Sequence, residues 1–312
     1  MNRQESAASR RHQPVMNDML FHIEEAGVLT TVQDLGRHGY RHLGFPLSGA
    51  VDPLAHRYAN HIVGNPGSDA TLEITMGGLK MEVLEPHLIA VTGADLDATI
   101  NQNPFPLWKA VKVQQGDQLR FRGPVHGIRS YLAVSGGIEH EMILGSRSVY
   151  ERAGIGRALK AGDFVFACRP VDKQDLAREG WQLASSYRPF YNNEITLRVI
   201  PGRHMERFTL ESIARLATQE FTLAGSDRMG AKLHTGSPLK HKKSADILSE
   251  PVMPGTVQVA VDGQPMILLA DAQTTGGYTS IGTVREEDLW QVAQLKQGGT
   301  VYLKMEEGWS DT

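Results

Sequence analysis

Five polar clusters in the 312-residue chain carry side chains that could bind or transform a small molecule. They occupy residues 30–40, 46–52, 145–148, 226–230 and 258–278. Arginine offers a planar fork of donors to a carboxylate or phosphate, and glutamine donates and accepts hydrogen bonds at once. Aspartate can orient an arginine or act as a general base. These residue types suit a small anionic or amide-bearing substrate.

The segment 271–278, with the sequence DAQTTGGY, is the strongest of these signals. It directly follows an apolar run at 266–269 that we predict to be a strand. Binding sites are commonly built from polar loops at strand ends. Gly276 and Gly277 would let the backbone approach a ligand closely. We therefore predict that this loop belongs to a binding site.

From these clusters we predict two groups of site residues. The candidate catalytic carboxylates are Asp34, Asp52 and Asp271. We expect Arg228 to bind a substrate carboxylate, and Asp271 and Gln273 to read an amide, in one cleft that the clusters share. Spacing singles out no nucleophile–base pair. The candidate substrate-binding residues are Gln33, Arg37, Ser48, Arg147, Asp227, Arg228, Gln264, Gln273, Thr274 and Tyr278.

Several of these residues also have a purely local explanation. Asp52 precedes Pro53, and this pair is typical of a helix N-cap followed by the first helical position. Asp227 could simply start a turn. Asp262-Gly263 is typical of a hairpin turn, which we favour over a binding role.

The elements that must position these residues are mostly short strands. The 32 glycines and 15 prolines punctuate short apolar runs, a pattern that favours strands and tight turns. The helices that we predict are few, at residues 53–63 (ended by Gly64), 210–217, 286–294 and 172–184. A Gly-Asp or Gly-Gly turn leading into an alternating strand recurs at 116, 162 and 298. The predicted strands lie at 72–75, 79–83, 88–91, 119–122, 128–134, 164–167, 195–200, 257–261, 266–269 and 300–304.

The chain is therefore predicted to be mainly β with a few short helices, in two β-rich units. We place these units at 20–184 and 195–305, divided by the polar stretch 185–194. Residues 1–18 are polar and are expected to form a disordered tail.

Composition excludes several classes of function. The net charge of −3 argues against a nucleic-acid-binding protein. No apolar run approaches the roughly 18 residues of a membrane span. Cys168 is the only cysteine, so a disulfide framework is excluded, and we predict that it is a buried core residue in a cytoplasmic protein. The chain lacks a recognised phosphate-binding loop, and we predict no metal site.

Taken together, the motifs resemble one known family in their order along the chain. The family of the 5-oxoprolinase C subunit, also described as the KipA or allophanate hydrolase subunit 2 type, is a biotin-dependent carboxyltransferase-like family. The resemblance runs from about residue 21 to 304. It rests on TTVQDLGRHGY (30–40), GFPLSGAVD (44–52), ANHIVGN (59–65), LEIT (72–75), YLAVSGGI (131–138), GSRS (145–148), DRMG (227–230), PGTVQ (254–258), GQP (263–265) and DAQTTGGY (271–278).

This resemblance implies a cyclophilin-like β-barrel architecture and an obligate complex. The implied partners are the other two 5-oxoprolinase subunits, a KipI-like one designated B and one designated A. The complex would use ATP to open 5-oxo-L-proline to L-glutamate. Two alternatives stay open. One is an allophanate hydrolase or urea-carboxylase-like carboxyltransferase subunit, and the other is a non-catalytic KipA-like antagonist of a KipI-like kinase inhibitor. The chain has no Met-Lys-Met biotinylation motif, so any biotin would arrive on a partner.

Overall fold

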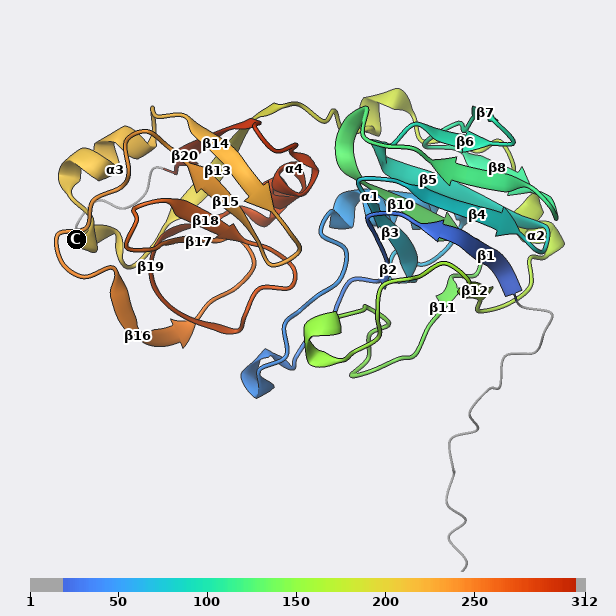
Figure 1. Ribbon diagram of the computed structural model, residues 1–312, viewed down its shortest axis with the longest axis horizontal. Helices are drawn as coiled ribbons and strands as arrows, with labels where there is room; N and C mark the ends of the chain where they lie inside the picture. The colour runs from blue at the N-terminus through green and yellow to red at the C-terminus, as the bar shows by residue number, and fades with distance from the viewer. Residues whose placement is uncertain (1–18, 307–312) are drawn as a thin grey trace, which may run out of the picture.

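The computed structural model describes residues 19–306, which form two β-rich halves that lie side by side (Figure 1). The predicted tail at 1–18 lies outside the described residues. The mainly β character that we predicted is confirmed: the described chain forms twenty strands and four α-helices.

The first half contains two antiparallel sheets that enclose one apolar core. The seven-stranded sheet has the order β11-β12-β1-β4-β9-β6-β7, and the five-stranded sheet has the order β2-β3-β10-β5-β8. Phe21 and Leu79 from the first sheet share a core cluster with Ile74 and Leu132 from the second. The strands are β1 (Met19–Ala26), β2 (Leu29–Gln33), β3 (Thr71–Thr75), β4 (Leu79–Val83), β5 (His87–Asp95), β6 (Ala98–Ile100), β7 (Asn103–Pro104), β8 (Ala110–Val113), β9 (Gln118–Phe121), β10 (His126–Val134), β11 (Ile138–Glu139) and β12 (Phe164–Ala167).

Helix α1 (Pro53–Val63) covers the other face of the five-stranded sheet, where Ala55 and Ile62 pack with Leu88 and Tyr131. The Asp52 carboxylate accepts a hydrogen bond from the Ala55 backbone N–H, and Gly64 ends the helix in the left-handed conformation. The predicted cap, start and end of this helix are therefore confirmed.

The second half is a closed barrel. The strand order β13-β20-β14-β15-β18-β17-β19 closes on itself because β19 also pairs with β13, and β16 extends the sheet beyond β19. Its core includes Leu197, Leu223, Val257 and Ile281. The strands are β13 (Glu194–Pro201), β14 (Phe221–Ser226), β15 (Gly230–His234), β16 (Asp246–Pro251), β17 (Thr256–Val259), β18 (Pro265–Leu268), β19 (Thr275–Val284) and β20 (Thr300–Met305).

Local signals predicted ten of the twenty observed strands, and the strands that they missed include β1, β14 and β19. Each predicted strand overlaps an observed one, and α3 (Leu210–Leu216) and α4 (Leu289–Gln294) lie where helices were expected. The turns at Gly116, Gly162 and Gly298 all have a left-handed φ, which explains their glycines. The hairpin at Asp262-Gly263 is confirmed between β17 and β18.

Three local expectations are wrong. The segment 271–278 was expected to be a loop, but β19 begins within it at Thr275. The helix predicted at 172–184 is only the single turn α2 (Lys173–Leu176). Cys168 is exposed, because alternate side chains along this segment face the core and those of Val165 and Ala167 already do so. The division of the chain into units at 20–184 and 195–305 stays a prediction.

Candidate functional site

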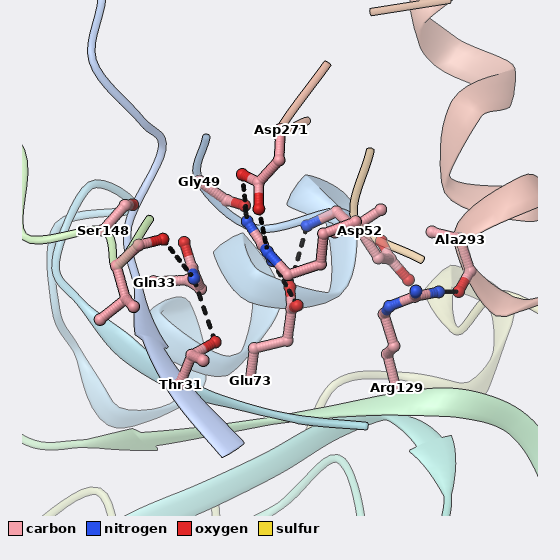
Figure 2. A network of polar contacts seen from close by, with 12 residues as sticks. Thr31, Gln33, Gly49, Asp52, Glu73, Arg129, Ser148, Asp271 and Ala293 are labelled. Atoms are coloured by element: carbon pink, nitrogen blue, oxygen red, sulfur yellow. Dashed lines mark hydrogen bonds and ion pairs between the residues drawn. The ribbon is translucent and has the colours of Figure 1, made fainter. Parts of the chain in front are cut away.

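The side chain of Arg228 joins the two halves of the molecule in a buried ion cluster with Glu73 and Asp271. Figure 2 labels its partners Gly49, Glu73 and Asp271. Its Nε donates to Asp271 Oδ2 at 2.8 Å, and its Nη1 donates to Glu73 Oε1. Its Nη2 donates to the Gly49 carbonyl oxygen at 2.6 Å and to Asp271 Oδ1 at 3.1 Å. All three guanidinium nitrogens therefore already have partners within the chain.

Glu73 forms the centre of this cluster on the first half. Its Oε2 accepts hydrogen bonds from the Val51 backbone N–H at 2.9 Å and the Tyr131 hydroxyl at 2.8 Å. Burial would raise the pKa of Glu73, but the Arg228 guanidinium and these donors lower it below its ordinary value. For Arg228, burial would lower the pKa, and the two carboxylates raise it above the usual range. Both groups are therefore held in their charged forms.

A second polar junction lies at the end of α4. Gln294 Oε1 accepts from the backbone N–H groups of Ile128 and Arg129 at 3.0 Å, where the pairing of β10 with β5 is irregular. Its Nε2 donates to Asp52 Oδ2 and to the Arg129 carbonyl oxygen at 2.8 Å. The Arg129 guanidinium in turn donates to the Ala293 carbonyl oxygen (Figure 2). Burial raises the pKa of Asp52 to about 6, although the hydrogen bonds that Asp52 accepts, including the one from Gln294, oppose the shift.

The predicted residues between 33 and 48 lie beside the ion cluster of Arg228. The Asp34 carboxylate accepts hydrogen bonds from the backbone N–H groups of Gly36 and Arg147 and from the hydroxyls of Ser146 and Ser148. Burial would raise the pKa of Asp34, but these four donors lower it. A carboxylate so fully bonded shapes the loops around it, so the geometry favours a structural role over that of a base.

Other candidates from the first half are held by both backbone and side-chain contacts. Gln33 Nε2 donates to Thr31 Oγ1 and to the Val149 carbonyl oxygen, and Arg37 Nη2 donates to the Ser148 carbonyl oxygen. Ser48 donates its backbone N–H to the Ala270 carbonyl oxygen at 2.9 Å, across the junction. The Arg147 side chain lies 3.1 Å from Glu139.

A shallow cavity of about 150 Å³ opens at the junction. Asp227, Arg228 and Asp271 line it with Thr31 and Arg152. The Asp227 carboxylate accepts from the Met229 and Gly230 backbone N–H groups, so its turn role is confirmed.

A larger cavity of about 220 Å³ lies against the outer wall of the barrel. Gln258 on β17 alternates with the core residues Val257 and Val259, so it faces away from the barrel interior. The register pairs Gln258 with Met266 and Met266 with Lys232, which aligns the three across neighbouring strands. The cavity is lined by Lys232, Gln258, Ala260, Asp262, Gln264, Met266, Gln273, Gly276, Gly277 and Tyr278.

Of the thirteen predicted site residues, six line one of these two cavities and seven line neither, so neither cavity gathers all the clusters. The single shared cleft stays a prediction. Gln264, Gln273 and Tyr278 line the barrel cavity, and Asp227, Arg228 and Asp271 line the junction cavity. Thr274 contributes its carbonyl oxygen to a bond with the Val252 N–H. The individual functional roles stay predictions.

The candidate residues did not include Gln258, Lys232 or Met266, which line the barrel cavity. The sequence does contain a signal for Gln258, since it is the amide in the otherwise apolar alternation of residues 257–259. Within residues 19–306, no cluster of three or more potential metal ligands occurs. None of the helices in that range has the length and hydropathy to cross a bilayer.

Comparison with known proteins identifies the family of this chain. A family model described as "carboxyltransferase domain, subdomain A and B" matches residues 43–305. The chain belongs to this carboxyltransferase family. The family assignment confirms the resemblance seen in the sequence motifs. A carboxyltransferase-family relative, the C subunit of 5-oxoprolinase from Escherichia coli, is 37% identical over 285 residues, which are 90% of this chain and 89% of that protein.

Other relatives of this carboxyltransferase-family chain are similar over most of its length. The C subunit of 5-oxoprolinase from Haemophilus influenzae is 34% identical and aligns with 87% of this chain and 86% of its own. The crystal structure of Kluyveromyces lactis urea amidolyase superposes with a TM-score of 0.85 at 30% identity. That superposition covers 92% of this chain but only 18% of the urea amidolyase.

Proposed function

We propose that this chain is the C subunit of a 5-oxoprolinase complex that uses ATP to open 5-oxo-L-proline to L-glutamate. The observation that carries the proposal is the 37% identity to the Escherichia coli protein, because it extends over about nine-tenths of both chains. The barrel cavity supports it, since its paired glutamine side chains suit an amide substrate. The urea amidolyase relatives are much longer than this chain. Their similarity is therefore weaker support for the function of the chain as a whole than the similarity to the Escherichia coli protein.

The proposed partners are the KipI-like B and the A subunits of the enzyme, in the cytoplasm. The described residues fit ATP poorly, because three carboxylates in the lining of the junction cavity face only two arginines. One of these arginines, Arg228, is already bonded to Asp271 and Glu73. In the barrel cavity the cation Lys232 lies 3.8 Å from Asp262, which offsets its charge. We therefore assign ATP binding to a partner and derive no step through it.

A carboxyltransferase subunit is the second candidate, and the likeness to urea amidolyase favours it. Biotin supplies a carboxyl carrier in such reactions, and here it would be attached to a partner. Its ureido group offers a carbonyl between two N–H groups, which Gln258 and Gln273 in the barrel cavity fit. No step of the proposal depends on it.

The test is reconstitution of the full complex. The chain is co-expressed with the KipI-like and A subunits, and ADP release is measured with 5-oxoproline, with urea or without substrate. We expect 5-oxoproline-dependent turnover that is lost when any one of the three proteins is omitted, and no ATP hydrolysis by the chain alone. Turnover stimulated only by urea would favour the second candidate. Full activity without this chain would instead indicate the non-catalytic antagonist.

A further inference from the structure

Gln258 is a buried amide with an incomplete set of hydrogen bonds. It is only 4% exposed, and its Nε2 has no hydrogen-bond partner among the described residues. Leaving a buried donor unpaired is unfavourable, because the group loses its hydrogen bonds to water and gains none in return. Such a cost is tolerated at sites where a ligand completes the bonding.

The position of the Gln258 amide is fixed from two sides. Gln273 Nε2 donates to Gln258 Oε1 at 3.3 Å, which holds the two side-chain amides together. Arg41 donates to the carbonyl oxygens of Gln273 and Val252 and so anchors the loop that carries Gln273. The unpaired Nε2 is therefore the end of Gln258 left for another acceptor.

Gly276 makes room for this arrangement. A Cβ atom at residue 276 would overlap Gln258 Nε2, so only glycine lets the amide lie over this part of β19. Glycine in the interior of a strand weakens it, and often marks the close approach of another group. The close approach of the Gln258 amide therefore explains why residue 276 is a glycine.

The remaining walls define the kind of ligand that fits. Met266 and the Tyr278 ring supply apolar surface, and both are partly exposed. The two charges of the cavity, Lys232 and Asp262, lie 3.8 Å apart and balance one another. A ligand with one carbonyl acceptor for Gln258 Nε2 and some apolar surface for Met266 and Tyr278 matches this lining.

We propose that the barrel cavity binds the amide group of a small molecule whose carbonyl oxygen accepts a hydrogen bond from Gln258 Nε2. This inference rests on the proposed function for the identity of the amide, which would be the lactam ring of 5-oxoproline. The carboxylate of that molecule is charged at neutral pH, and Lys232, the one cation among the described residues that line this cavity, would face it. Gln258 is thereby assigned as a substrate-binding residue, with Gln273 and Gly276 positioning it.

The test measures binding directly in the full chain, alone and in the reconstituted complex. Amide-nitrogen NMR spectra are recorded during titration with 2-pyrrolidone, with 5-oxo-L-proline and with urea. We expect saturable shifts of the Gln258 side-chain amide with the lactams. Gln258→Met keeps the side-chain volume but removes the donor, and should weaken binding roughly 2- to 12-fold. Gln297→Met, at an exposed position of the same half, is the matched control and should bind like the wild type.

Each outcome bears on one hypothesis. The inference fails if neither lactam binds saturably in the chain or the complex, or if Gln258→Met binds as tightly as the wild type. It also fails if binding is lost in Arg152→Ala, because Arg152 lines the junction cavity instead. A preference for urea over the lactams would keep the cavity but replace its ligand. Lactam binding through Gln258 without 5-oxoproline-dependent turnover would overturn the proposed function and leave the site intact.

Discussion

The ion cluster at Arg228 and the barrel cavity at Gln258 are both built from buried polar side chains, yet they differ in how far their hydrogen bonds are satisfied. Arg228 is 8% exposed and Gln258 4% exposed. Every nitrogen of the Arg228 guanidinium has a partner, including two carboxylates, whereas Gln258 Nε2 has none among the described residues. Burial alone therefore does not separate a structural group from a binding group.

The difference lies in what surrounds each side chain. Arg228 is enclosed by Glu73, Asp271 and the Gly49 carbonyl oxygen, which come from both halves of the molecule. Gln258 faces a cavity of about 220 Å³. We interpret the Arg228 ion cluster as the contact that holds the two halves together, and we call it the clamp. We interpret Gln258 as a group that binds a ligand.

The largest expected effect is on the clamp. Arg228→Met should lower the free energy of unfolding by about 3–5 kcal/mol, because it leaves the buried Glu73 and Asp271 carboxylates without their cation. Urea denaturation measures this change. Arg203→Met removes an arginine from an exposed ion pair with Glu250 and should cost less than about 1 kcal/mol. Equal stability of the two variants would break the distinction between clamp and surface pair.

The next largest expected effect is a pH dependence of the free energy of unfolding, which arises in the first half of the molecule. His56 on α1 lies 2.9 Å from Thr71 Oγ1 and 3.1 Å from the Gly67 carbonyl oxygen, and burial lowers its pKa to about 4. Between pH 6.5 and 4 the unfolded chain therefore binds more protons at His56 than the folded chain does. The stability that His56 contributes in its neutral form is lost as the pH falls through that window. The shift corresponds to about 3 kcal/mol.

Asp52 acts in the opposite direction, because its pKa is raised and its protonation in acid favours the folded state. The measurement is therefore the difference between wild type and His56→Gln in urea unfolding at pH 7 and at pH 4. We expect the wild type to lose about 3 kcal/mol relative to the variant over this range. A difference that does not change with pH would show that His56 is not held neutral.

The smallest effect sharpens the cavity side of the comparison. Gly276→Ala should displace the Gln258 amide and weaken lactam binding roughly 2- to 12-fold, because it removes one oriented hydrogen bond. Gly225→Ala in β14 is the control, since an added Cβ there meets nothing within 4 Å. NMR titration with 2-pyrrolidone measures both variants. Unchanged binding in Gly276→Ala would show that the Gln258 position does not matter.

The sequence determined what depends on near neighbours. The Asp52-Pro53 start and the Gly64 end of α1, the Asp262-Gly263 hairpin and the glycine turns before β9, β12 and β20 were all predictable. In each case the deciding residues lie within a few positions of one another, so propensity, capping and turn chemistry suffice. The residue pattern also identified the segment 271–278 as a place for polar chemistry, although not which side chains would meet there or that β19 begins within it.

Only the tertiary structure decided which buried polar groups have hydrogen-bond partners within the chain. Arg228 was predicted to bind a substrate carboxylate, and a guanidinium does suit that task. The structure brings it against Glu73, 155 residues away in the chain, so the carboxylates that it binds belong to the protein itself. Gln258 was left with an unpaired donor by the same packing. A side chain's chemistry is set by its type, but its free donors depend on which distant segments are packed around it.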